Sequence, residues 1–333
     1  MSAQKRRSFK KKLEKYTSQR IALSVIDQKQ KELDEECNTM IRTIKRTVAE
    51  AFVANTIASE EFYLISGNYF TKIEQEYLPA EIAMVKFSFE NGITNKYHTY
   101  VAPENIQMGY QADAIEHSTN THRLAVPPNA TGERNYQRIL NEMKRFMGEP
   151  TPILFTFEEN IAMIKSFIRL FANSGNNDDI KVYPLHQLFY EIKVMTAKNS
   201  AMERPSFGSI NIAKEHLRRY DCVLTAGTAC AYHELDCGKH CPLSHVQHWA
   251  YILFHHICGD LNIKLISGEH SPCEGQSSRS AIASNVVTGL TARVDRVLSV
   301  QNDKDIPTLA SRINRKRPGG ALKSPKISTF DST

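Results

Sequence analysis

The stretch Cys230–His245 constrains this chain more than any other, because it places three cysteines and three histidines within sixteen residues. Cys230 and His233 form a Cys-x-x-His pair, which can hold a sulfur and a nitrogen on one metal ion. Zinc favours such ligands in a tetrahedron, with bonds of about 2.0 to 2.3 Å. Cys241 directly precedes Pro242, a suitable first residue of a helix, and a helix dipole there lowers the pKa of the thiol. The segment therefore predicts a metal site.

The cluster by itself does not identify a fourth ligand. Cys237, His240 and His245 are candidates, and so is a carboxylate from a distant part of the chain. A group of buried free thiols is the alternative to a metal site, since cysteine packs as a small hydrophobic residue.

The positive charge is concentrated at the two ends of the chain. Residues 1–20 contain eight Lys or Arg and one Glu, and residues 305–333 contain six Lys or Arg and two Asp. Subtracting these from the totals of 42 and 36 leaves 28 basic and 33 acidic residues for 21–304, so the body is mildly acidic. Basic ends of this kind are typical of nucleic-acid-binding arms and nuclear-import signals, and also of solvated tails.

The seven cysteines are clustered rather than spread as a disulfide framework. The first twenty residues are charged and lack the apolar core of a secretory signal. No run approaches the roughly 20 apolar residues that a membrane span needs. We therefore expect an intracellular soluble protein with reduced thiols and no membrane partner.

The hydrophobic pattern predicts an α/β sheet covered by helices on both faces, because a strand meander is followed by alternating strands and helices. The predicted helices are 33–52, 133–147, 160–171, 186–195, 209–220 and 243–258, and the predicted strands are 62–70, 81–89, 97–101, 153–157 and 180–183. Residues 103–131 are expected to be a loop. Thr156 and Glu159 resemble a capping box before the third of these helices.

With these elements in place, the chain resembles the Maelstrom family over its MAEL domain, roughly Phe62 to Gly268. The matching segments are Gly67-Asn68-Tyr69-Phe70, Pro79-Ala80-Glu81-Ile82, Pro127-Pro128-Asn129-Ala130, Glu159-Asn160-Ile161-Ala162, Cys230-x-x-His233-Glu234 and Cys241-x-Leu243-Ser244-His245. They occur in the family's order, which makes the resemblance specific.

The resemblance implies an RNase H-like fold similar to DEDD-type exonucleases, a mixed sheet flanked by helices, with one structural Zn²⁺ site. The family's Glu-Cys-His-Cys set falls on Glu81, Cys230, His233 and Cys241. Cys241 is preferred to Cys237 because the Leu-Ser-His after it continues the family pattern. The rival set is entirely local and uses Cys237 in place of Glu81.

The expected domains are a basic arm and amphipathic helix at 1–58, the RNase H-like MAEL domain at 59–270, and a disordered basic tail at 271–333. Many family members begin with an HMG box, which the basic arm and helix here do not resemble. The duplex-binding role of that box is therefore not expected from these residues.

The resemblance implies a single-stranded RNA-binding adaptor in piRNA-mediated transposon silencing in the germline, with piRNA-pathway proteins as partners and no small-molecule substrate. The expected location is the perinuclear granules called nuage, and the nucleus. A nuclease that cleaves single-stranded RNA and a zinc-stabilised protein-interaction module are the alternatives.

No catalytic residue is expected from the sequence. DEDD exonucleases hold two metal ions with four carboxylates, two of them as Asp-x-Glu on the opening strand. We match that strand to Glu81-Ile82-Ala83, which offers one carboxylate, and the later ligand positions offer thiols, which select zinc over magnesium. The family is also associated with a weak, metal-independent cleavage of single-stranded RNA, for which the sequence shows no general acid–base pair.

Overall fold

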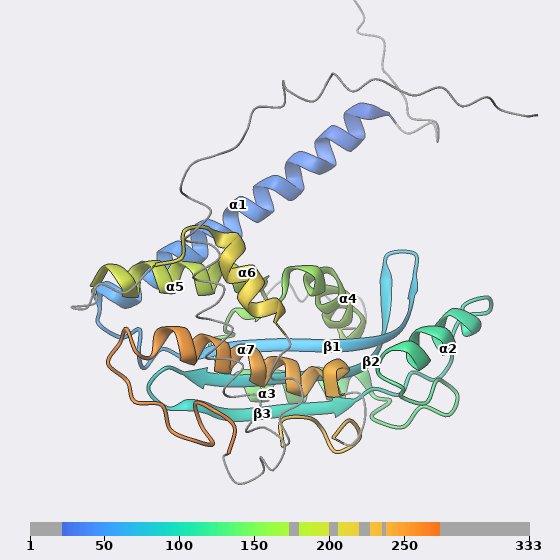
Figure 1. Cartoon of the computed structure of the whole chain (residues 1–333). Coiled ribbons are helices and arrows are strands. Elements are labelled where there is room, and N and C mark those ends of the chain that lie inside the picture. Colours follow the sequence, from blue (N-terminus) through green and yellow to red (C-terminus); the bar gives the residue numbers. More distant parts are fainter. Residues whose placement is uncertain (1–21, 173–179, 200–205, 220–226, 235–237, 274–333) are drawn as a thin grey trace, which may run out of the picture. The chain divides into compact units, whose positions relative to one another are not determined.

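The computed structural model describes residues 22–172, 180–199, 206–219, 227–234 and 238–273. Its centre is a five-stranded mixed sheet in the order β3-β2-β1-β4-β5. Figure 1 shows β1, β2 and β3 of this sheet. The strands are β1 (Phe62–Ile73), β2 (Glu76–Ser88), β3 (Gly92–Tyr100), β4 (Leu154–Thr156) and β5 (Val182–Pro184). The expected mixed α/β architecture is confirmed.

The first three strands form an antiparallel meander, and β4 and β5 continue the sheet parallel to β1. The helices are α1 (Leu23–Val53), α2 (Gln111–Asn120), α3 (Tyr136–Met147), α4 (Ile161–Phe171), α5 (Leu185–Asn199), α6 (Ile210–Arg218) and α7 (Pro242–Ile257), with short 3-10 turns η1 (Glu158–Asn160) and η2 (Gly238–His240).

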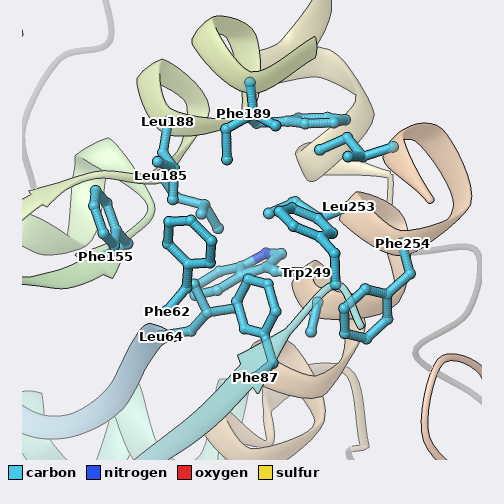
Figure 2. Packing of buried hydrophobic residues seen from close by; sticks show 14 of the residues in the cluster. Phe62, Leu64, Phe87, Phe155, Leu185, Leu188, Phe189, Trp249, Leu253 and Phe254 are labelled. Atoms are coloured by element: carbon cyan, nitrogen blue, oxygen red, sulfur yellow. The ribbon is translucent and has the colours of Figure 1, made fainter. Parts of the chain in front are cut away.

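Two apolar cores cover the two faces of the sheet. On one face, Leu64, Val85 and Phe87 pack against α7 and α5, with Trp249 and Leu253 of α7 among the buried side chains (Figure 2). On the other face, Ile65 and Met84 pack against α3 and α4 through Met143 and Phe167. Side chains that alternate along β1 and β2 therefore serve both cores, which is why these strands show nearly continuous hydrophobic character.

A buried ion pair links α5 to the residues that follow α7. Lys193 Nζ donates to Asp260 Oδ2 at 2.7 Å and to the carbonyl oxygen of His256 at 2.9 Å. Thr196 Oγ1 donates to the same Asp260 oxygen at 3.0 Å. Because both charges are hydrogen-bonded as well as paired, their burial is compensated, and the pair fixes α7 beside α5.

The long amphipathic helix is confirmed but begins ten residues earlier than expected, at Leu23. Only its C-terminal part is buried, through Ile44, Val48 and Ala51, which join the core beside α5. Lys45 also pairs with Glu191 of α5 at 3.6 Å. None of the described helices is both long enough and apolar enough to cross a membrane.

Two local predictions are wrong. The expected loop 103–131 contains α2, which buries only Ala114 and Ser118 and so gives little periodic signal. The expected capping box is absent, because Thr156 ends β4 and its Oγ1 has no partner among the described residues. α4 begins instead at Ile161, after η1, without a side-chain cap. The basic arm and nearly all of the basic tail lie outside the described residues, so the expected domain boundaries stay predictions.

Candidate metal centre

Glu81 lies on β2 with its carboxylate fully buried, on the face of the sheet that α7 covers. Strand pairing places Asn68 of β1 and Tyr100 of β3 directly beside it. This position corrects the assignment of Glu81 to the opening strand. The opening strand is β1, whose residues Phe62–Ile73 include no Asp or Glu. β1 ends at Ile73 and β2 begins at Glu76, so the hairpin turn comes before Glu81. Glu81 therefore lies on the second strand.

Cys230 and His233 come from one tight turn. The backbone amides of His233 and Glu234 both donate to the carbonyl oxygen of Cys230, at 3.0 Å each. This turn brings the side chains of Cys230 and His233 to the same side, with Sγ 3.1 Å from Nδ1. The expectation that a Cys-x-x-His pair can present sulfur and nitrogen together therefore agrees with the geometry.

Cys241 is the N-cap residue of α7, and Pro242 follows in its first turn. Its Sγ accepts a hydrogen bond from the backbone amide of Cys230 at 3.2 Å. The expected helix start is therefore confirmed, and it places Cys241 against the turn that carries Cys230. The residue that closes the set on the other side is Glu81, about 150 positions earlier in the chain.

The four side chains could hold one metal ion. One ligand atom from each of Glu81, Cys230, His233 and Cys241 lies within 4.8 Å of every other. Glu81 Oε1 lies 3.4 Å from Cys230 Sγ and 3.5 Å from His233 Nδ1. A tetrahedral zinc site has neighbouring ligand atoms about 3.3 to 3.8 Å apart, given its bond lengths. Two thiols, one imidazole and one carboxylate are ligands that zinc accepts, so the residues fit that ion.

The hydrogen bond on the far side of the His233 ring fixes its tautomer. His233 Nε2 lies 2.7 Å from the carbonyl oxygen of His122, which can only accept. Nε2 therefore carries the proton when the ring is neutral, and Nδ1 presents its lone pair to Cys230 and Glu81. A backbone carbonyl in this position is a common way to orient a metal-ligating histidine.

Three further residues surround the set and were not identified from the sequence. Asn68 Nδ2 donates to Glu81 Oε2 at 3.0 Å and to the carbonyl oxygen of His240 at 2.7 Å. His98 Nε2 lies 2.7 Å from Glu81 Oε1, and the Tyr100 hydroxyl donates to Cys230 Sγ at 3.2 Å. Asn68 belongs to a segment that carries the family resemblance, whereas His98 and Tyr100 gave no signal before their strand was paired with β2.

The charges of the two thiols depend on each other. A hydrogen bond from Cys241 lowers the pKa of Cys230 strongly, and the His233, His98 and Tyr100 side chains act in the same direction. The same bond to Cys230, together with burial, raises the pKa of Cys241. This corrects the expectation from the helix dipole, which is weaker here than the neighbouring thiolate. A divalent cation would supply the positive charge that allows both thiols to ionise.

The two imidazoles that touch Glu81 are basic for the same reason. Burial opposes protonation of His98, but its hydrogen bonds to Cys230 and Glu81 prevail and raise its pKa to about 9. Burial likewise opposes protonation of His233, and bonds to the same two side chains raise its pKa to about 10. The hydrogen bonds to Cys230 and Glu81 thus favour the positively charged form of both His98 and His233.

The remaining candidate ligands lie elsewhere. His240 contributes its carbonyl oxygen to Asn68, and His245 Nε2 lies 2.7 Å from the carbonyl oxygen of Lys239. Neither belongs to the group of four described above. Cys237 lies outside the described residues, so the local rival set is not tested by this geometry.

The comparison with solved structures matches this chain to structures of E. coli exonuclease I. One, in complex with a 5cy-dA13 oligonucleotide, is 11% identical, with a TM-score of 0.34 over 58% of this chain and 40% of that chain. Another, in complex with a dT13 oligonucleotide, is 15% identical, with a TM-score of 0.29 over 45% and 32%. Because these scores are low, the assignment of the fold rests on the strand order of the sheet itself.

The sequence comparisons are much stronger. A family model described as "Maelstrom: piRNA pathway germ-plasm component" matches residues 71–277. The protein maelstrom homolog of Culex quinquefasciatus is 31% identical over 87% of this chain and 58% of its own length. Protein maelstrom of Drosophila melanogaster is 34% identical over 92% and 68%. Protein maelstrom 1 of Drosophila pseudoobscura pseudoobscura is 34% identical over 75% and 72%. On the extent of these matches, the chain belongs to the Maelstrom family.

Proposed function

We propose that this chain is a single-stranded RNA-binding adaptor in piRNA-mediated transposon silencing in the germline, with one structural zinc ion. Membership of a family described as a piRNA-pathway germ-plasm component supports the pathway. The chain spans 58% of the Culex relative and 68% of the Drosophila melanogaster relative, so the role is proposed for this chain alone.

The observation that carries the structural role of the metal is the closure of its site. Glu81, Cys230, His233 and Cys241 are at most 4% exposed. Four protein ligands complete a tetrahedron, whereas catalytic zinc sites keep one position for water or substrate. A zinc ion here would join β2 to the turn at Cys230 and to the start of α7. It would thus hold the sheet to the helix that covers it.

The sheet supports an RNase H-like fold, because an antiparallel meander continues into parallel strands with helices on both faces. The site does not support the two-metal chemistry of DEDD exonucleases. β1 carries no carboxylate, and the thiols beside Glu81 favour zinc over magnesium. We therefore place the adaptor role ahead of the nuclease.

RNA and piRNA-pathway proteins are the partners, and perinuclear granules and the nucleus are the location. The RNA-binding unit would be residues 59–270, with residues 1–58 and 271–333 flanking it. The basic residues of 1–20 and 305–333 would add affinity through phosphate contacts.

The test is a polarisation assay of the full chain with a labelled single-stranded RNA and with a duplex DNA of equal length. Tighter binding to the RNA is expected, and it should weaken steeply as salt concentration rises, as phosphate contacts require. Equal or tighter binding to the duplex would contradict the proposal. Measuring the zinc content of the same sample tests the structural zinc ion separately from RNA binding.

The same RNA, end-labelled, distinguishes the adaptor from a nuclease. No progressive shortening is expected in magnesium or manganese. Shortening that stops on chelation and follows the protein through further purification would favour the nuclease. Zinc-loaded protein that binds no RNA would favour the protein-interaction module.

A further inference from the structure

The N-terminal half of α1 carries an apolar stripe that nothing in the described chain covers. Every residue from Leu23 to Thr39 is exposed, including Leu23 at 38%, Ile26 at 41% and Leu33 at 51%. The same helix is buried from Ile44 onward, where it packs beside α5. One helix therefore has a partner along one half of its length and an exposed apolar stripe along the other.

The stripe has the spacing of a coiled-coil seam. Steps of three and four residues lead through Leu23, Ile26, Gln30, Leu33, Cys37, Met40 and Ile44. These positions alternate as a and d of a heptad, with apolar side chains at all but Gln30. The seam is continuous with the buried face, because Met40 is half-buried and Ile44 is buried in the core. The exposed part thus extends an existing helix–helix interface.

Charged residues beside the seam indicate how a second copy of this helix would pair with it. In this heptad, Lys29 stands at g and Asp34 at the e position of the next heptad. In a parallel pair of such helices, g of one chain meets the following e of the other, so Lys29 would face the partner's Asp34, twice by symmetry. An antiparallel pair would instead bring together the e-position residues Asp27 and Asp34, which is repulsive. It would also bring Lys29 to the g-position Glu36, but Glu36 is already paired with Lys165 of α4 in its own chain.

We propose that the segment Leu23–Cys37 of α1 is a self-association surface, which pairs in parallel with the same segment of a second copy of this chain. Two heptads span about 22 Å of helix. A free helix of this length is marginal in water, because nucleation is costly. Here the packed half, through Ile44, Val48 and Ala51, holds the helix in register, and the exposed half continues it. The surface is distinct from the proposed RNA and zinc functions.

Sedimentation equilibrium of the full chain under reducing conditions tests the proposal. The mass should rise with concentration from 37.8 kDa toward twice that value. Leu33→Glu should keep the monomer mass at every concentration. Val25→Glu is the matched control, since Val25 is 58% exposed on the same helix at a c position, off the seam, and should still dimerise. Both variants change only exposed positions, so they should keep the parent's zinc content and, at dilutions where the parent is monomeric, its melting temperature.

The charge pair tests the orientation. Lys29→Glu and Asp34→Lys should each weaken the dimer by about tenfold, and the double variant should restore it. A short bis-maleimide, which alkylates one thiol at each end, should join the two copies through Cys37, an exposed thiol at an a position, and Cys37→Ser should abolish that product. A parent chain that stays monomeric, or a Leu33→Glu variant that dimerises like the parent, would overturn the proposal. Failure of the double variant to recover would overturn the parallel arrangement.

Discussion

Asn68 bridges two parts of the chain that are 172 residues apart, because its side-chain amide donates to the carbonyl oxygen of His240 at 2.7 Å. The same nitrogen donates to Glu81 Oε2 at 3.0 Å. A single residue of β1 therefore orients the carboxylate of the candidate metal centre and anchors the segment that leads into α7. The arrangement of the four candidate ligands therefore depends on this contact.

Asn68→Ala should weaken metal binding without abolishing it. Outer hydrogen bonds to a ligand are typically worth about 10- to 100-fold in metal affinity. Leaving the buried Glu81 oxygen without a donor should also lower the free energy of unfolding by about 1–3 kcal/mol. Competition with a zinc chelator measures the first effect and thermal unfolding the second. Asn141→Ala, an exposed change on α3, is the control and should match the parent in both.

Cys230→Ser and Cys241→Ser should each lose the metal and become protease-sensitive. The reason is that the site connects residues about 150 positions apart, and removing one thiol leaves three ligands and a charged, buried remnant. Elemental analysis and limited proteolysis are the measurements. Cys273→Ser, at an exposed thiol away from the site, should keep both metal and resistance. Normal zinc in Cys241→Ser would remove that residue from the ligand set.

Glu81→Ala should lose zinc, and Cys237→Ala should retain it. The carboxylate is the ligand furthest away in sequence, and it is fully buried beside Cys230 and His233. Glu81→Gln keeps the shape and the bond from Asn68 but removes the charge, so its zinc affinity should fall between those of the parent and the alanine variant. Full zinc in Glu81→Ala together with none in Cys237→Ala would establish the local rival set instead.

Stability should fall as pH is lowered from about 6.5 toward 4, in part because of His248 on α7. Burial lowers the pKa of His248 to about 4, whereas an unfolded histidine titrates near 6.5. The unfolded chain binds more protons between these values, so the contribution is fully present above pH 6.5 and is lost as pH falls. Both ring nitrogens of His248 are buried without a hydrogen-bond partner among the described residues.

His248→Leu should therefore flatten the pH dependence of stability between pH 6.5 and 4. At pH 7 it should leave the free energy of unfolding unchanged or raise it by about 1 kcal/mol, since an unpaired polar ring is removed from the core. Urea unfolding at several pH values measures both effects. The exposed His255 offers a comparison, and His255→Leu should change the pH dependence less. A profile for His248→Leu that parallels the parent would show that other groups control the acid sensitivity.

The local sequence determined most of the elements. Periodic apolar residues located the strands around Phe62 and Tyr97 and the helices that contain Ile139 and Trp249, because these segments bury one face or both. Cys230, His233 and Cys241 could be recognised together because they are close in the chain. α2 escaped recognition because it buries little, and the capping box failed because Thr156 ends a strand rather than starting a helix.

Only the tertiary structure decided which distant groups reach the three local candidate ligands, Cys230, His233 and Cys241. No spacing rule connects Glu81 with Cys230, and the family resemblance had to supply that pairing until the β1–β2 hairpin and α7 placed both on one face of the sheet. Asn68, His98, Tyr100 and the carbonyl of His122 joined them through strand register and loop packing. A sequence encodes residues and local periodicity, whereas a buried polar site depends on long-range pairing, which local pattern does not specify.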